Sequence, residues 1–214
     1  MKRYSRLLVG AVMLAVIAPV ASASLIQIQM GGVDLRYNGT NVFDAGPGAN
    51  PDPLTNVTFL VDGFQPGPAD TTGVALELDI QGVLNIPVGG GQVGGTGGTL
   101  ALTLGGGEYL SLDLSTISIT YIPVTATIQF VFVGTAASST GQNLPYSISI
   151  DDPISVSFST QTVQPVGQSG SFLSSFSTAG TGEIQGFGTG VPEPATLALL
   201  GMGLGTVILK RRRR

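Results

Sequence analysis

The chain has 214 residues and contains no Cys, no His and no Trp. Without His or Cys, the sequence excludes Ser-His-Asp and Cys-His catalysis and metal sites built on nitrogen or sulfur ligands. Residues 24–190 carry one base, Arg36, against twelve acids, which is a net charge of −11. Because nucleic-acid binding depends on Lys and Arg that neutralise phosphates, this charge excludes nucleic acid as a partner.

The first 23 residues have the layout of a secretory signal peptide. A basic start is followed by the apolar run 7–18 and then by small residues. Ala21 and Ala23 form an A-x-A cleavage site, which predicts that signal peptidase releases a chain beginning at Ser24. The alternative is an uncleaved membrane anchor, but this run is shorter than the roughly 17–25 residues that span a bilayer.

Within the body, which we take as residues 24–190, residues 24–177 are dominated by apolar residues that alternate with polar ones, as in half-buried strands. The alternation is clearest at 26–30, 74–80 and 117–120. Segment 125–133 combines high β-propensity with no charge, which favours a central strand over an exposed edge. We therefore expect an all-β domain, an antiparallel β-sandwich or a jelly-roll-like fold. Further strands are expected at 57–61, 83–88, 100–104, 109–114, 146–150, 154–158 and 172–176.

The C-terminal part divides into a spacer, a short proline motif and an apolar helix. Residues 178–190 are rich in Gly and Thr, which predicts a flexible spacer. The apolar run 195–209 carries no charge and predicts a transmembrane helix about 22 Å long, within which Gly201 and Gly205 permit close helix packing. The basic tail should stay in the cytoplasm by the positive-inside rule. The tail consists of Lys210, Arg211, Arg212, Arg213 and Arg214, and the proline motif of Val191, Pro192, Glu193 and Pro194.

The proline motif, the apolar helix and the basic tail, in this order, resemble the PEP-CTERM sorting signal of Gram-negative bacteria. The resemblance implies recognition and processing by exosortase, an integral membrane enzyme of the cysteine transpeptidase type. It also implies an intermediate anchored in the inner membrane and a final place at the cell surface or in the extracellular matrix. Exopolysaccharide is then a candidate partner. The resemblance covers residues 191–214 alone and implies nothing about the fold of the body.

Two pairs of acidic residues are candidate sites in the body. Asp151 and Asp152 could ligate calcium, a cation that takes oxygen ligands; the alternative is an Asp-rich turn before Pro153. No other cofactor is expected. Glu77 and Asp79 share one strand face and could support glycoside hydrolysis, with a solvated strand face as the alternative.

Tyrosine side chains are the large amphipathic aromatics of the body. They are candidates for contact with polysaccharide, with ordinary strand packing as the alternative. The residues are Tyr37, Tyr109, Tyr121 and Tyr146.

The sequence as a whole favours a non-enzymatic exported protein of the surface or biofilm matrix. Two alternatives stay open: a carbohydrate-binding module, with or without calcium, and a polysaccharide-active enzyme that uses two carboxylates.

Overall fold

The structure is a computed structural model, and it describes residues 23–44, 52–66, 71–104, 107–137, 142–145 and 148–188. These residues form antiparallel β-structure, and no α-helix lies among them. The expected all-β class is confirmed.

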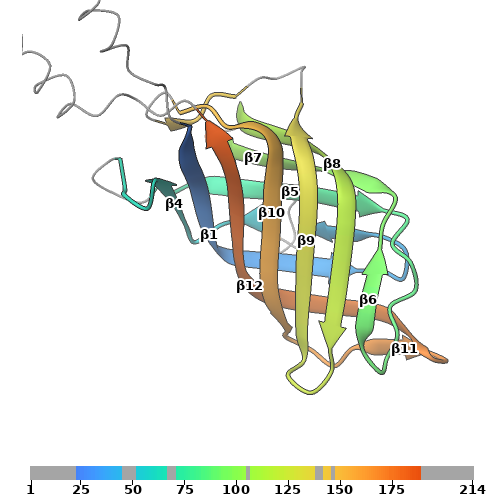
Figure 1. The fold of residues 1–214 in the computed structure, drawn as a ribbon. Helices are drawn as coiled ribbons and strands as arrows, with labels where there is room; N and C mark the ends of the chain where they lie inside the picture. Colours follow the sequence, from blue (N-terminus) through green and yellow to red (C-terminus); the bar gives the residue numbers. More distant parts are fainter. Residues whose placement is uncertain are drawn as a thin grey trace, which may run out of the picture.

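Eight strands close into a barrel, in which every neighbouring pair is antiparallel (Figure 1). The closing pair joins the first and last strands, from Ser24 opposite Gly188 to Tyr37 opposite Phe176. A sandwich would leave these two edges open, so the predicted sandwich or jelly roll is wrong. Alternation reveals which residues face a core, but it does not reveal which strands pair. In spatial order the eight strands are β1 (Ser24–Tyr37), β2 (Val42–Asp44), β5 (Val74–Gln81), β7 (Gly97–Leu104), β8 (Gly107–Ile122), β9 (Thr127–Ala136), β10 (Asp151–Thr162) and β12 (Phe172–Gly188).

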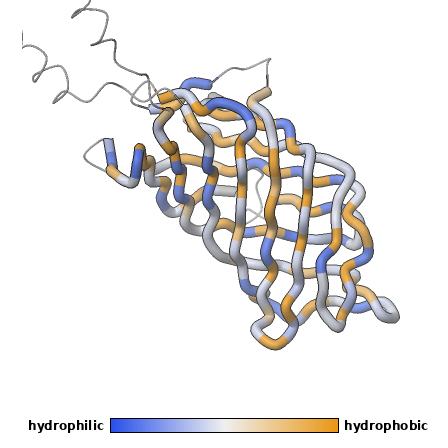
Figure 2. Tube along the Cα trace, viewed as in Figure 1, coloured by the Kyte–Doolittle hydropathy of each residue, from blue (hydrophilic) through white to orange (hydrophobic). Residues whose placement is uncertain are grey.

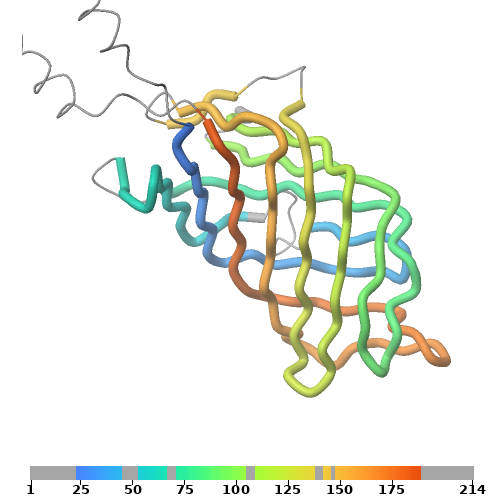
Figure 3. Tube along the Cα trace, viewed as in Figure 1, coloured from blue at the N-terminus to red at the C-terminus, as the bar shows by residue number. Residues whose placement is uncertain are grey.

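Four short strands extend the walls of the barrel. β3 (Asp52–Pro53) pairs with β5, and β4 (Asn56–Val61) pairs with the first half of β1. β6 (Gly91–Gly94) pairs with the second half of β8, and β11 (Gly167–Ser169) forms a hairpin with β12. β1 and β8 each pair with two successive strands along one edge and with a third strand along the other edge. Both strands bend between their two halves, with register shifts at Gly31/Val33 and Leu114/Thr116 (Figure 3).

Inward-facing apolar side chains fill the barrel with one continuous core. Polar and apolar residues alternate along the strands (Figure 2), and β5 buries every second residue. Phe130, Phe132 and Phe158 form an aromatic cluster with ring centroids 5.8–6.4 Å apart. β9 lies between β8 and β10, so the predicted central strand is confirmed. Because the core is complete within residues 24–188, we expect the barrel to fold without either end of the chain.

The C-terminal half of β12 occupies most of the segment that the sequence predicted as a spacer. Residues 178–188 pair with β1 on one side and β10 on the other, so the spacer prediction is wrong for them. The glycines of this segment allow neighbouring strands and side chains to pack closely against it. A Cβ on Gly182 would meet the Phe158 ring and lie 2.9 Å from Met30 Cε, and one on Gly188 would lie 2.7 Å from Ile26 Cδ1.

Two other predicted strands are not regular strands. Residues 83–86 bury Val83 and Ile86 without strand pairing. In the predicted strand 146–150, residues 148–150 are irregular, and Ile148 and Ile150 are buried. The Gln142 side chain replaces a strand partner there: Ile150 N–H donates to its Oε1 at 2.8 Å, and its Nε2 donates to the Ile150 carbonyl at 2.6 Å.

Candidate functional site

The described residues next to the two processing signals lie together at one end of the barrel. Ser24, the predicted first residue after cleavage, begins β1 directly opposite Gly188, the last residue of β12. Three residues separate Gly188 from Pro192 in the sequence. The described structure includes Ala23 and Ser24; Ala21, the proline motif and residues 195–214 lie outside it. Among the described residues, no helix has the length and apolar character needed to cross a bilayer, and the helix expected at 195–209 lies beyond them.

The strands β4, β1, β12, β10 and β9 lie side by side in one wall of the barrel (Figure 1). A shallow hollow of about 640 Å³ crosses the outer face of this wall. We call it the outer groove. Strand register aligns its outward side chains in two rows, one residue from each strand. One row is Thr58, Gln29, Glu183, Ser157 and Val131; the other is Asn56, Gly31, Thr181, Ser159 and Gln129.

Side-chain size explains the hollow. In the second row the central residues Gly31, Thr181 and Ser159 are small, whereas Asn56 and Gln129 at the two ends are longer. Phe130, Phe158 and Met30 belong to the same strands, but their side chains are buried on the inner face, so the side chains that the groove presents are mainly polar.

Amide and hydroxyl groups dominate the chemistry of the outer groove. Its one ionisable lining side chain is Glu183, which is half-buried. Glu183 Oε1 accepts a hydrogen bond from Gln27 Nε2 at 2.8 Å, across the β1–β12 pair. Such a lining can donate to and accept from a polar ligand, but it lacks the second carboxylate that glycoside hydrolysis requires.

The predicted carboxylate pair lies elsewhere, on β5. Glu77 is exposed and Asp79 half-exposed, and both point outward from β5, as the sequence predicted. Asp79 Oδ2 accepts a hydrogen bond from Gln81 Nε2 at 3.2 Å on the same strand face. The outer groove is lined by neither residue, so the pair and the hollow are separate features.

Asp151 and Asp152 begin β10, at the end of the barrel that carries Ser24 and Gly188. Asp152 Oδ1 accepts the Ala136 N–H at 2.8 Å, which ties β10 to the end of β9, and Asp151 is opposite Phe187. The described residues contain no group of three or more acidic, His or Cys side chains that could together hold a metal. The two residues belong to the irregular start of β10 and not to the Asp-rich turn that was the alternative to a calcium site.

The tyrosine candidates pack inside the barrel. Tyr37, Tyr109 and Tyr121 are buried, so the packing alternative is correct for these three; Tyr146 lies outside the described residues. Tyr37 stacks on Phe176, with ring centroids 5.1 Å apart. The hydroxyls of Tyr37 and Tyr109 have no hydrogen-bond partner in the described part of the chain, and burial raises the pKa of both above the ordinary tyrosine value.

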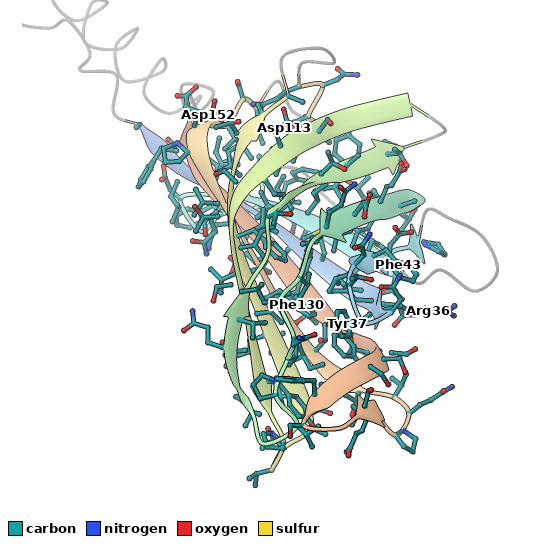
Figure 4. All side chains as sticks on the ribbon, turned by 90° about the vertical axis from the view of Figure 1, so that its right-hand side faces the viewer. Arg36, Tyr37, Phe43, Asp113, Phe130 and Asp152 are labelled. Carbon is teal, nitrogen blue, oxygen red and sulfur yellow. The ribbon has the colours of Figure 1, made fainter. Side chains whose placement is uncertain are left out.

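A second hollow, of about 380 Å³, contains Arg36, the single base of the body. Arg36 is opposite Phe43 on β2 and Ser177 on β12, and Figure 4 shows Arg36 and Phe43 close together. Gln164 and Ser175 complete its polar lining.

Of the residues that line the two hollows, the sequence singled out one as a candidate for ligand contact, Tyr37 in the second hollow. Their Gln, Ser and Thr side chains read as ordinary outward strand positions, and only strand pairing brings them together. Alternation alone could have marked them as outward-facing, but not as neighbours.

Residues 190–214 match the family described as the PEP-CTERM protein-sorting motif. The match confirms the resemblance and indicates an exported protein that passes through the membrane and is sorted by an exosortase-type membrane enzyme. No curated protein and no solved structure matches the chain.

Proposed function

We propose that this chain is a non-enzymatic exported protein of the bacterial surface or biofilm matrix. Its barrel would be the delivered unit, and its C-terminal signal would direct delivery. One observation carries the proposal: the matched sorting motif begins at residue 190, two residues after the last barrel strand ends at Gly188. The sorting signal and the folded body are thus joined almost directly.

The composition of the body supports a binding or structural role. Residues 24–190 contain no His, Cys or Lys, which are common general bases and nucleophiles near neutral pH. The described hollows bring together amides and hydroxyls instead. This lining favours the carbohydrate-binding alternative over the enzymatic one.

Localisation with and without exosortase tests the proposal. We expect the host strain to place a protein that lacks Arg214 at its surface or in its matrix, and a strain without exosortase to retain the full C-terminus in the inner membrane. A P192A/P194A variant should behave in the host like the exosortase deletion, whereas T99A, on the outer face of β7, should be delivered normally. A surface protein that keeps Arg214 in both strains would refute the sorting part of the proposal.

Activity assays test the non-enzymatic part. The purified protein should release no reducing sugar from the host's own exopolysaccharide. Turnover that is abolished by Glu77→Gln or Asp79→Asn would instead establish the carboxylate enzyme.

A further inference from the structure

We propose that the outer groove is a binding site for a neutral, hydroxyl-rich polysaccharide chain lying across the strands. The inference deepens the proposed function by assigning a ligand class to the delivered barrel. It rests on the shape, charge and hydrogen-bonding groups of the groove.

The shape fits an extended chain. The groove spans five adjacent strands, from β4 to β9. At about 4.8 Å between neighbouring strands, it is about 19 Å long, which is enough for a few linked sugar rings. Its two rows of side chains run across the strands, so a linear ligand would meet a new pair of polar groups at each strand.

Charge selects a neutral ligand. The body carries a net charge of −11, and the groove lining contains one acidic side chain, Glu183, and no base, so an acidic polymer would be repelled. A polycation would find a single carboxylate, which already accepts a hydrogen bond from Gln27. Hydroxyl groups suit this lining because they donate to carboxylate and amide oxygens and accept from amide N–H and Ser or Thr hydroxyls.

A peptide suits the groove less well. Peptides commonly bind a sheet by adding a strand to a free edge, where backbone groups are unpaired. The β1, β12 and β10 segments that line the groove each have a paired neighbour on both sides. Among the outward side chains of the two rows, Val131 is the single large apolar one, so an apolar peptide anchor would have little to contact.

The outer groove has no exposed aromatic ring, which determines how tightly we expect it to bind a polysaccharide. Phe130 and Phe158 are buried beneath the lining, so sugar rings would have no aromatic face on which to stack. Recognition would rest on hydrogen bonds, each of which strengthens binding by about two- to tenfold. We therefore expect weak binding by one site and stronger retention on a long polymer that engages many copies.

The test uses the full chain, purified in a detergent that has no sugar headgroup. The probes are dextran, mixed-linkage β-glucan and galactomannan as neutral polymers, and alginate as an acidic one, compared by affinity electrophoresis and calorimetry. We expect binding to at least one neutral polymer and none to alginate.

Two groove variants and one matched control locate the site. Ser159→Trp fills the centre of the groove and should weaken binding at least tenfold. Gln29→Ala removes an amide without adding bulk and should weaken binding about two- to tenfold, as expected for the loss of one hydrogen bond. Thr99→Trp places the same bulk on the exposed face of β7 and should leave binding unchanged. Melting curves identify any variant that fails to fold, and Gln29→Ala then carries the test.

Three results would overturn the proposal: no binding to any neutral polymer, binding to alginate alone, or binding that both groove variants retain. The outcome is separable from that of the sorting experiment. Failure of exosortase processing would leave polymer binding by the purified chain intact, and loss of polymer binding would leave processing intact.

Discussion

Replacing Ile184 with alanine is expected to destabilise the barrel strongly. Ile184 points inward from β12, is 0% exposed, and lies opposite Ile28 on β1 and Val156 on β10. The substitution removes three buried carbon atoms, which corresponds to about 2.4 kcal/mol at roughly 0.8 kcal/mol for each. The cavity left behind raises the expected loss of unfolding free energy to about 3–4 kcal/mol.

Urea unfolding and thermal melting of residues 24–190, followed by circular dichroism, measure this loss. A domain of this size should lose about 10 °C in Tm. Phe187→Ala is the control, because Phe187 is 60% exposed three residues further along the same strand and should cost well under 1 kcal/mol. If Ile184→Ala unfolds at the same urea concentration as the wild type, residues 178–188 are outside the cooperative fold and the spacer interpretation returns.

The remaining predictions concern Tyr109 and the N-terminal end of the chain. Tyr109→Phe should stabilise the barrel at pH 7 by about 1 kcal/mol, because it removes a buried hydroxyl that has no partner among the described residues. Burial raises the pKa of Tyr109, so the wild type should lose stability as pH rises above about 10, where unfolded tyrosine ionises. Tyr109→Phe should lose less stability over the same pH range. If alkaline urea titrations give both proteins the same slope of unfolding free energy against pH, this prediction is wrong. N-terminal sequencing of the exported protein should begin at Ser24, and a mature chain that starts at Met1 would disprove the cleavage site.

Alternation predicted much of the sheet because the barrel has one buried face. β5 and β9 are clear examples: their inward residues are large and apolar, and their outward residues are polar or exposed. The same signal could not distinguish a barrel from a sandwich, since both bury every second residue. Closure depends on the pairing of β1 with β12, two segments at opposite ends of the body.

Glycine explains the largest error of the sequence prediction. A Gly-, Ser- and Thr-rich segment is typical of a flexible linker. In β12, however, Gly182 and Gly188 face neighbouring side chains so closely that no Cβ fits, and Thr178 is buried with its hydroxyl donating to the Leu35 carbonyl at 3.4 Å. Composition alone cannot separate these two uses of small residues, because the difference lies in what surrounds them.

The direct connection between β12 and the sorting signal limits where the barrel can lie before processing. Seven residue steps separate Gly188 from Ala195, the first residue of the apolar run, and a fully extended chain covers about 24 Å over that distance. The end of the barrel that carries Ser24 and Gly188 must therefore stay within about 24 Å of the start of that run. β12 is hydrogen-bonded on both sides, to β1 and to β10, so a pull on the C-terminus along the strand would load both ladders together. Before processing, attachment through this strand would hold the barrel by the most extensively paired of its described strands.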